Sequence, residues 1–462
     1  MAREIQEMEL PLQPESGDKS YLTITFGCQA NEFDTEVLAG MLESLGYRPA
    51  ASPEEADIIV VNTCAVRRKP EEKVAALLGR LKSLKEKKES LIIAVGGCMI
   101  QQPDVAAELA RRFRHVNLFF GTHALPRFPQ LLQQAQVSRR PLIDIEENGD
   151  CREGLPMRRS SSFRAWVPVI YGCNNFCSYC IVPYVRGRER SRPFDEIVRE
   201  VRSLAEKGYL EVTLLGQNVN SYGHDLDEGR DFADLLEALD RIDGLSRIRF
   251  LTSHPKDLSP RLIKAMRSGS KICEHLHLPA QAGSNRILQL MNRRYTRERY
   301  LELVERLREA IPGIALTTDL MVGFPGETEE DFQQTLALVE EARFDQAFTF
   351  IYSPRRGTRA AEMKKEEIPA DEKRERLRRL ARLQNEISLQ INRTLVGKRV
   401  ELLVEGKSKN NPAMQSGRTR TNKLVHFAAE EDLTGKLVEV EITAAYTWYL
   451  AGKLLEPAKA PA

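Results

Sequence analysis

Between residues 21 and 120, short apolar runs alternate with longer amphipathic segments. The apolar runs are YLTITFGC, ADIIVVNTC, SLIIAVGGC and VNLFFG, and segments such as NEFDTEVLAGMLESLG and DVAAELARRF between them have helical spacing. Strands that alternate with helices in this way are typical of a parallel α/β sheet. We therefore predict an amino-terminal parallel α/β domain over residues 19–150, preceded by a flexible polar tail over residues 1–18.

A second alternating series follows the polar stretch EENGDCREGLPMRRSSS, which has the composition of a linker. Strands are expected in WVPVIYG, VTLLGQN, RIRFLTS, ICEHLHLPA, IALTTDLMVGF and QAFTFIY, and each except the last precedes a helical pattern. Six such units, rather than eight, predict an open, partial TIM barrel, (βα)6, over residues 160–394. An open side leaves room for a large substrate at the face where the strands end.

The last part of the chain has a different pattern. Alternating charges in DEKRERLRRLARLQNEISLQINR, residues 371–393, favour a helix with a solvated face. Short strands with turn signals over residues 395–458 then predict a small all-β barrel comparable to OB-type modules. Its loops carry basic residues that suit either a phosphate backbone or plain solvation: Lys407, Lys409, Arg418, Arg420 and Lys423.

Composition and charge limit the expected partners and the expected cellular compartment of the chain. The net charge is only +2, so a global basic field does not indicate a nucleic-acid partner. No apolar run approaches the roughly 18 residues of a membrane span, and the first residues lack the apolar core of a secretory signal. We expect a cytoplasmic protein without membrane contact, in which the eight cysteines serve as ligands or catalytic groups rather than disulfides.

Three cysteines of the first domain each come just as a predicted strand ends: Cys28, Cys64 and Cys98. The carboxyl ends of parallel strands meet at one edge of a sheet, where ligands collect. We therefore expect these three thiols to lie together although they are distant in sequence.

The second domain contains the compact triplet GCNNFCSYC, with Cys173, Cys177 and Cys180. Zinc takes clustered thiolates, and a fourth ligand is available in Cys273, His275 or His277. A single CxxxCxxC triplet without a second pair favours instead a 4Fe–4S cluster with one iron free of protein ligands. Polar residues at corresponding strand ends favour a site around it: Gln217, Asn218, Ser253, His254, His277 and Asp319.

The triplet, with Tyr179 before its last cysteine and a six-unit barrel around it, resembles the radical S-adenosylmethionine (SAM) enzymes. Within them, TFGCQANEFDT, NTCAVRRKPEEKV, VGGCMIQQ, YGCNNFCSYCIVPYVRGRERSRP and DLMVGFPGETEEDF are similar to the methylthiotransferases, and VEGKSKNNPAMQSGRTRTNKLVHF is similar to their TRAM domain. The resemblance implies two 4Fe–4S clusters, one held by the triplet and an auxiliary one held by Cys28, Cys64 and Cys98. Ala30 and Arg68 depart from residues common in the family.

The resemblance is strongest to the tRNA-directed branch. It implies insertion of sulfur and a methyl group at C2 of N6-isopentenyladenosine beside the anticodon, by a 5′-deoxyadenosyl radical made from SAM. The implied partners are the tRNA anticodon stem-loop and an electron donor such as a flavodoxin or ferredoxin, and the chain is expected to be a monomer. Alternatives are action on threonylcarbamoyl-adenosine or on a ribosomal-protein aspartate, and a non-catalytic, metal-containing RNA-binding protein.

The resemblance also implies roles for individual residues. SAM contacts are expected from Tyr179, Gln217, Ser253, His275, His277, Gln281 and Asp319. Contacts to the RNA substrate are expected from Gln29, Asn31, Asn62, Arg67, Arg186 and Arg192, together with the basic residues of the TRAM domain.

Overall fold

The structure is a computed structural model that describes residues 19–65, 68–146, 154–227, 229–363, 367–409 and 411–455. The chain forms two compact units. The first holds the described residues up to Ser160 together with Tyr184–Gly187, and the second holds Ser161–Pro183 and the chain from Arg188 onward.

The first unit is built on a parallel sheet with the strand order β2–β1–β3–β4–β5–β6. The strands are β1 (Ser20–Thr25), β2 (Arg48–Pro49), β3 (Ile58–Thr63), β4 (Ile92–Gly97), β5 (Leu118–Phe120) and β6 (Leu142–Asp144). Every residue of β3 and β4 is buried, as expected for strands covered on both faces. The predicted parallel α/β fold and its four main strands are confirmed, whereas the short edge strands β2 and β6 were not predicted because they are only two and three residues long.

Helices follow the strands of this sheet. They are α1 (Gln29–Ser44), α2 (Arg68–Lys87), α3 (Pro103–Arg112) and α4 (Phe128–Val137), the last entered through the 3₁₀ helix η1 (Thr122–Arg127). The short helix α5 (Val182–Val185) lies where the chain passes from the second unit into the first.

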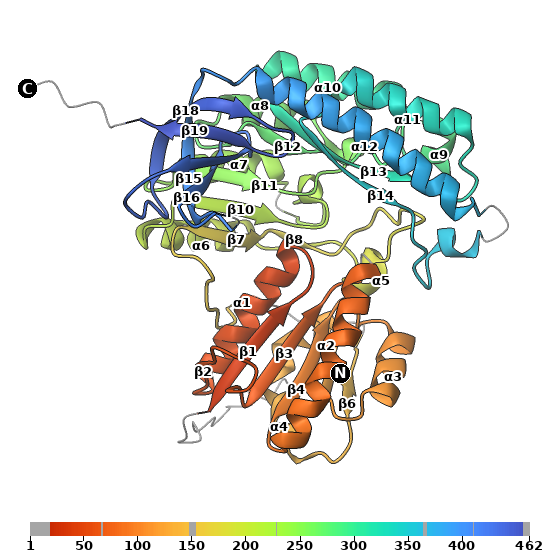
Figure 1. The fold of residues 1–462 in the computed structure, drawn as a ribbon, viewed down its shortest axis with the longest axis vertical. Coiled ribbons are helices and arrows are strands. Elements are labelled where there is room, and N and C mark those ends of the chain that lie inside the picture. The colour runs from red at the N-terminus through yellow and green to blue at the C-terminus, as the bar shows by residue number, and fades with distance from the viewer. Residues whose placement is uncertain are drawn as a thin grey trace, which may run out of the picture. The chain divides into compact units, whose positions relative to one another are not determined.

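The second unit contains the six predicted strands of an open barrel, in two three-stranded parallel sheets (Figure 1). One has the order β11–β10–β7, with β7 (Arg164–Pro168), β10 (Glu211–Leu215) and β11 (Arg247–Phe250), and the other has the order β12–β13–β14, with β12 (His275–His277), β13 (Ala315–Val322) and β14 (Gln346–Ile351). A parallel bridge links Ile248 of β11 to Ile272, which lies three residues before β12. The predicted (βα)6 barrel is therefore confirmed.

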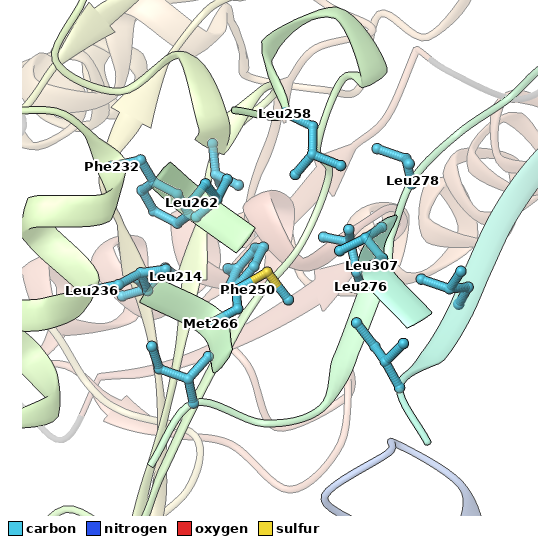
Figure 2. Close-up of a cluster of buried hydrophobic side chains, with 14 of the residues drawn as sticks. Leu214, Phe232, Leu236, Phe250, Leu258, Leu262, Met266, Leu276, Leu278 and Leu307 are labelled. Atoms are coloured by element: carbon cyan, nitrogen blue, oxygen red, sulfur yellow. The ribbon is translucent and has the colours of Figure 1, made fainter. Parts of the chain in front are cut away.

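Helices surround this barrel: α6 (Phe194–Glu206), α7 (Phe232–Asp240), α8 (Pro260–Ser268), α9 (Asn285–Leu290), α10 (Arg297–Ala310), α11 (Glu329–Ala342) and α12 (Ala370–Arg393). Short elements lie in its loops: β8 (Ile170–Tyr171), β9 (Arg190–Ser191), η2 (Val219–Ser221), η3 (Pro255–Asp257) and η4 (Arg359–Glu362). Leucine and phenylalanine side chains from strands and helices fill the space between them, including Phe232, Phe250 and Leu276 (Figure 2). The segment GFPGET shapes a helix start, since the hydroxyl of Thr328 caps α11 and Asp331 returns the bond in a capping box.

Helix α12 is more than a solvated charged helix. Most of its charged residues lie on an exposed face, but Leu380 and Ile387 are buried in the barrel core, and the charged Arg376 is buried as well. Gln384 donates a hydrogen bond to the carbonyl of Phe344 over 2.8 Å, and Arg376 pairs with the buried Glu327 at 2.6 Å. The helix thus follows β14 and completes the sixth βα unit of the barrel, which the alternating charges did not indicate.

The carboxy-terminal strands form a closed five-stranded barrel in the order β15–β16–β17–β19–β18 (Figure 1). They are β15 (Arg399–Lys407), β16 (Met414–Thr419), β17 (Leu424–Ala428), β18 (Leu437–Ala445) and β19 (Leu450–Leu454). Leu402, Val425 and Phe427 are among the residues that fill its core, which confirms the predicted small barrel. Among the described residues no helix is long and apolar enough to cross a membrane.

Candidate active site

The first cysteine set lies at the carboxyl edge of the parallel sheet. Cys28 is the residue before α1, and Cys64 and Cys98 directly follow the neighbouring strands β3 and β4. A hydrogen bond from the Cys64 thiol lowers the pKa of Cys28 to about 5 against the opposing effect of burial, helped by the charge of Arg186 and by backbone N–H groups at the start of α1. Burial raises the pKa of Cys98. The set therefore contains one thiol that readily ionises.

Two asparagines, Asn31 and Asn62, hold the loops that carry these cysteines. Asn31 donates to the Asn62 side chain at 3.1 Å and to the carbonyl of Thr63 at 3.0 Å, and Asn62 donates to the Asn31 carbonyl at 2.8 Å. The Cys28 thiol in turn donates to Asn31 Oδ1 at 3.4 Å. Both asparagines are at most 2% exposed. We predicted that they contact substrate, but their polar atoms are used within the protein, where they position the cysteine loops.

Arg186 belongs to the first unit and contacts the cysteine set directly. Its Nε donates to Cys98 Sγ over 3.1 Å, and its Nη2 donates to Asp34 over 2.8 Å. Its side chain and that of Asp34 are both nearly fully buried. The arginine predicted to contact RNA therefore donates a hydrogen bond to a thiol of the first cysteine set.

The second cysteine set follows β8, after a turn in which Gly172 has a positive φ of 70°. Burial raises the pKa of Cys173 to about 11 and that of Cys180 to about 12, and the neighbouring Cys177 contributes to both shifts. Asn175 donates to Cys173 Sγ at 3.4 Å, and Arg293 donates to Cys177 Sγ at the same distance. Three mutually interacting thiols, two of them buried, with sulfur-directed donors around them are suited to binding a metal cluster.

The two cysteine sets fit 4Fe–4S clusters. All six cysteines are free thiols. Within the described ranges no three histidine, cysteine or acidic side chains are grouped as the ligands of one metal ion would be. In a 4Fe–4S cluster each thiolate binds a different iron, so the sulfur atoms need not meet at one point.

Unpartnered buried polar atoms of the second unit fit a polar cofactor. Across the described residues, the buried atoms Ser178 Oγ, Ser253 Oγ and Gln281 Oε1 have no hydrogen-bond partner. Ser253 follows β11 and Gln281 follows β12, so both stand at strand ends, and Gln281 has a positive φ of 68°. Orphaned buried polar groups and left-handed backbone at a non-glycine residue are costly and concentrate at functional sites.

The remaining predicted SAM contacts differ in burial and in their position along the chain. Tyr179 is half-buried beside the triplet, and Gln217 is half-buried just after β10. His277 Nε2 lies 3.7 Å from Asp319 Oδ2. His275 lies deeper, at the first residue of β12, and burial lowers its pKa well below the usual value. This position fits a structural role better than a SAM contact.

Thr317 joins the two histidines. Its hydroxyl lies 3.1 Å from His275 Nε2 and 3.0 Å from His277 Nδ1. Because one hydroxyl donates a single hydrogen, Thr317 couples the tautomers of the two rings. Neither Thr317 nor Arg293 was singled out from the sequence, since an isolated threonine or arginine carries no motif.

The residues predicted to contact RNA divide into exposed and internal groups. Gln29, Lys407 and Lys409 are exposed. Arg192 is buried and donates to the carbonyl of Pro168 and to Glu200, both at 2.8 Å, which favours a structural role. Arg67 lies outside the described residues.

The basic turn of the small barrel, residues 418–423, docks on the open barrel of the same unit. Arg420 makes a bidentate ion pair with Glu274, which directly precedes β12, and Lys423 pairs with Asp345, which directly precedes β14, at 2.6 Å. Arg247, the fully buried first residue of β11, donates to the carbonyl of Arg418 at 2.8 Å. Arg420 and Lys423 therefore pair with carboxylates at the amino ends of the barrel strands. The exposed Lys407 and Lys409 are better placed to contact RNA.

Comparison with known proteins agrees with this geometry. The Radical SAM superfamily profile matches residues 167–339, the TRAM domain profile matches residues 393–455, and the profile named Uncharacterized protein family UPF0004 matches residues 20–121. A solved structure of the radical SAM methyltransferase TsrM from Kitasatospora setae has a TM-score of 0.55 at 14% identity, covering 87% of this chain and 81% of that chain, which supports the fold. The fold and site therefore define an enzyme of the radical SAM class.

Curated relatives give the family. The tRNA-2-methylthio-N(6)-dimethylallyladenosine synthase of Acetivibrio thermocellus is 53% identical over 98% of this chain and 94% of its own length. The enzyme of that name from Moorella thermoacetica is 54% identical over 95% of this chain and 99% of its own. The chain belongs to the family of tRNA-2-methylthio-N(6)-dimethylallyladenosine synthases.

Proposed function

We propose that this chain is a tRNA methylthiotransferase that inserts sulfur and a methyl group at C2 of N6-isopentenyladenosine next to the anticodon. The observation that carries the proposal is identity above 50% over nearly the whole chain with synthases of that name, combined with two separate cysteine sets. One set serves a radical SAM enzyme in general, and a second set is what a sulfur-inserting reaction additionally needs.

The residues have distinct roles in this proposal. Cys173, Cys177 and Cys180 hold one 4Fe–4S cluster, and Cys28, Cys64 and Cys98 hold an auxiliary one. When bound, the cluster of Cys173, Cys177 and Cys180 would supply, together with SAM, a 5′-deoxyadenosyl radical, and a second SAM would supply the methyl group. Ser253, Gln281 and Asp319 bind and orient SAM at the strand ends, and burial of the site excludes water that would quench a radical.

The partners follow from the chemistry. A single-stranded anticodon loop allows the target adenine to be splayed out of the stack. Lys407 and Lys409 contact phosphates of the stem-loop, and a flavodoxin or ferredoxin supplies single electrons. The enzyme acts as a monomer in the cytoplasm, where its RNA substrate is available.

The test combines cells with purified protein. Nucleosides of tRNA from a deletion strain are analysed by mass spectrometry, with loss of methylthio-isopentenyladenosine expected. Retention of that nucleoside, or loss of methylthio-threonylcarbamoyl-adenosine instead, contradicts the proposal. Anaerobically reconstituted protein should form 5′-deoxyadenosine from SAM, and a Cys177→Ala variant should not, while both bind the stem-loop.

A further inference from the structure

Arg293 is a buried arginine beside the second cysteine set. It follows α9 in a tight turn in which Asn292 and Arg294 both have positive φ, and its side chain is only 4% exposed. Its Nη1 donates to Cys177 Sγ at 3.4 Å, its Nη2 to the carbonyl of Pro279 at 2.7 Å, and its Nε to the hydroxyl of Tyr295 at 2.9 Å. All three nitrogens of the guanidinium are therefore directed at defined acceptors.

None of these acceptors is a carboxylate. In the described part of the chain no acidic side chain pairs with Arg293, whereas the buried Arg249 pairs with Glu211 at 2.7 Å and Arg186 pairs with Asp34 at 2.8 Å. A buried cation without a counter-ion is costly, which points to an anion that completes the site.

We propose that Arg293 is a positioning residue for the iron–sulfur cluster of Cys173, Cys177 and Cys180, with its guanidinium bonded to the Cys177 sulfur and acting as the fixed counter-charge of the cluster. Three thiolates give such a cluster a net negative charge, which grows by one unit when the cluster takes one electron. Hydrogen bonds to ligand sulfurs and nearby charge set the reduction potential of iron–sulfur clusters. The cation therefore favours the reduced form.

The same arginine also fixes the segment that leads to Gln281. Its bond to the Pro279 carbonyl is joined by a bond from the Tyr295 hydroxyl to the carbonyl of Ala280 at 2.8 Å. One side chain thus ties the sulfur of a cluster ligand to the strand end that carries an unpartnered buried amide oxygen. This gives Arg293 a geometric role besides the electrostatic one, and the two roles are separated by experiment.

The experiment measures the cluster, not the RNA reaction. Full-length protein in which Cys28, Cys64 and Cys98 are replaced by alanine is reconstituted anaerobically, so that only the triplet cluster remains. Arg293→Gln, Arg293→Lys and the matched control Arg294→Gln, which removes an exposed charge one residue on, are each titrated with dithionite and followed by electron paramagnetic resonance. Iron and labile sulfide are counted in every sample.

We expect Arg293→Gln to shift the midpoint potential to a more negative value, Arg293→Lys to stay closer to the parent, and Arg294→Gln to leave it unchanged. If the glutamine variant does not hold its cluster, retention of iron by the lysine variant supports the requirement for charge. An unchanged potential in the glutamine variant at full iron content overturns the proposal. So does a lysine variant that matches the glutamine variant in potential or in iron loss.

The inference rests on the triplet cluster of the proposed function but not on its RNA substrate. A negative result here leaves the tRNA nucleoside test unaffected. Failure of the nucleoside test, with a potential shift still observed, rejects the substrate and keeps the role of Arg293.

Discussion

Arg186 and Cys98 are joined by a hydrogen bond of 3.1 Å between the guanidinium Nε and the thiol Sγ, although 88 positions separate them in sequence. The arginine lies six positions after the last cysteine of the triplet, yet it belongs to the unit that contains the other cysteine set. Its Nη2 donates to the buried carboxylate of Asp34, which balances the charge of the guanidinium. The pair is therefore an internal support for the proposed auxiliary cluster.

Replacing Arg186 by glutamine should reduce the iron bound by the first cysteine set. The substitution removes the donor to Cys98 and also the cation of a buried ion pair with Asp34, which costs roughly 3–5 kcal/mol of stability. Iron is counted in a background in which Cys173, Cys177 and Cys180 are alanine. Arg188→Gln, which removes an exposed charge two residues on, is the control.

A double variant separates the two effects of that change. Asp34→Asn combined with Arg186→Gln removes both buried charges, so the thermal midpoint should recover relative to the single variant while the iron content stays low. Full iron content in the double variant would show that Arg186 acts only through the stability of the fold.

Gly97 should not tolerate alanine. Its φ is +100°, and a Cβ there would lie 2.4 Å from both Asn62 Oδ1 and the carbonyl of Thr63. We expect Gly97→Ala to lower the free energy of unfolding by about 2 kcal/mol or more, measured by urea unfolding. Gly79→Ala is the matched control, because Gly79 lies within α2 with open space around it, and there alanine should add about 0.5–1 kcal/mol of stability.

Lys407 and Lys409 should contribute to RNA affinity. Both are exposed, and replacing either by glutamine should weaken binding of an anticodon stem-loop. The salt dependence of log K should also fall, by about one unit for each phosphate that the variant no longer neutralises. Fluorescence anisotropy at several salt concentrations measures both quantities. If the variant with both Lys407→Gln and Lys409→Gln kept the same slope of log K against log salt concentration, these lysines would not contact RNA phosphates.

Arg420 should instead act on stability. Because its bidentate pair with Glu274 is partly exposed, we expect Arg420→Gln to lower the free energy of unfolding by about 1 kcal/mol. The midpoint of thermal unfolding monitors the change, and the exposed Arg399→Gln is the control. If Arg420→Gln left the midpoint unaltered and weakened RNA binding as strongly as Lys407→Gln, the original expectation for Arg420 would hold.

The sequence alone was sufficient for features that depend on local pattern. The alternation of apolar runs and amphipathic segments indicated the parallel sheet and the six barrel strands, because each element is specified by its own residues. The placement of Cys28, Cys64 and Cys98 followed from the general rule that parallel strands end at one edge.

Other features depend on partners far away in the chain and carry no local signal. Arg186 and Arg192 were expected to contact RNA, but both are buried, where they pair with Asp34 and Glu200. The basic turn of the small barrel likewise pairs with Glu274 and Asp345, more than 70 positions earlier. The sequence alone does not show whether a cationic side chain is solvated, binds nucleic acid or pairs with a distant carboxylate.

The docked turn at 418–423 also has a mechanical consequence. Since Arg247, Arg249, Arg420 and Lys423 fasten the small barrel to the large one near the amino ends of its strands, we expect the two barrels to move as one body. RNA that binds to the small barrel would then lie at a fixed distance from the carboxyl ends of the large barrel's strands, where we propose that the reaction takes place. The carboxy-terminal module would therefore set how far the bound RNA lies from the reaction site.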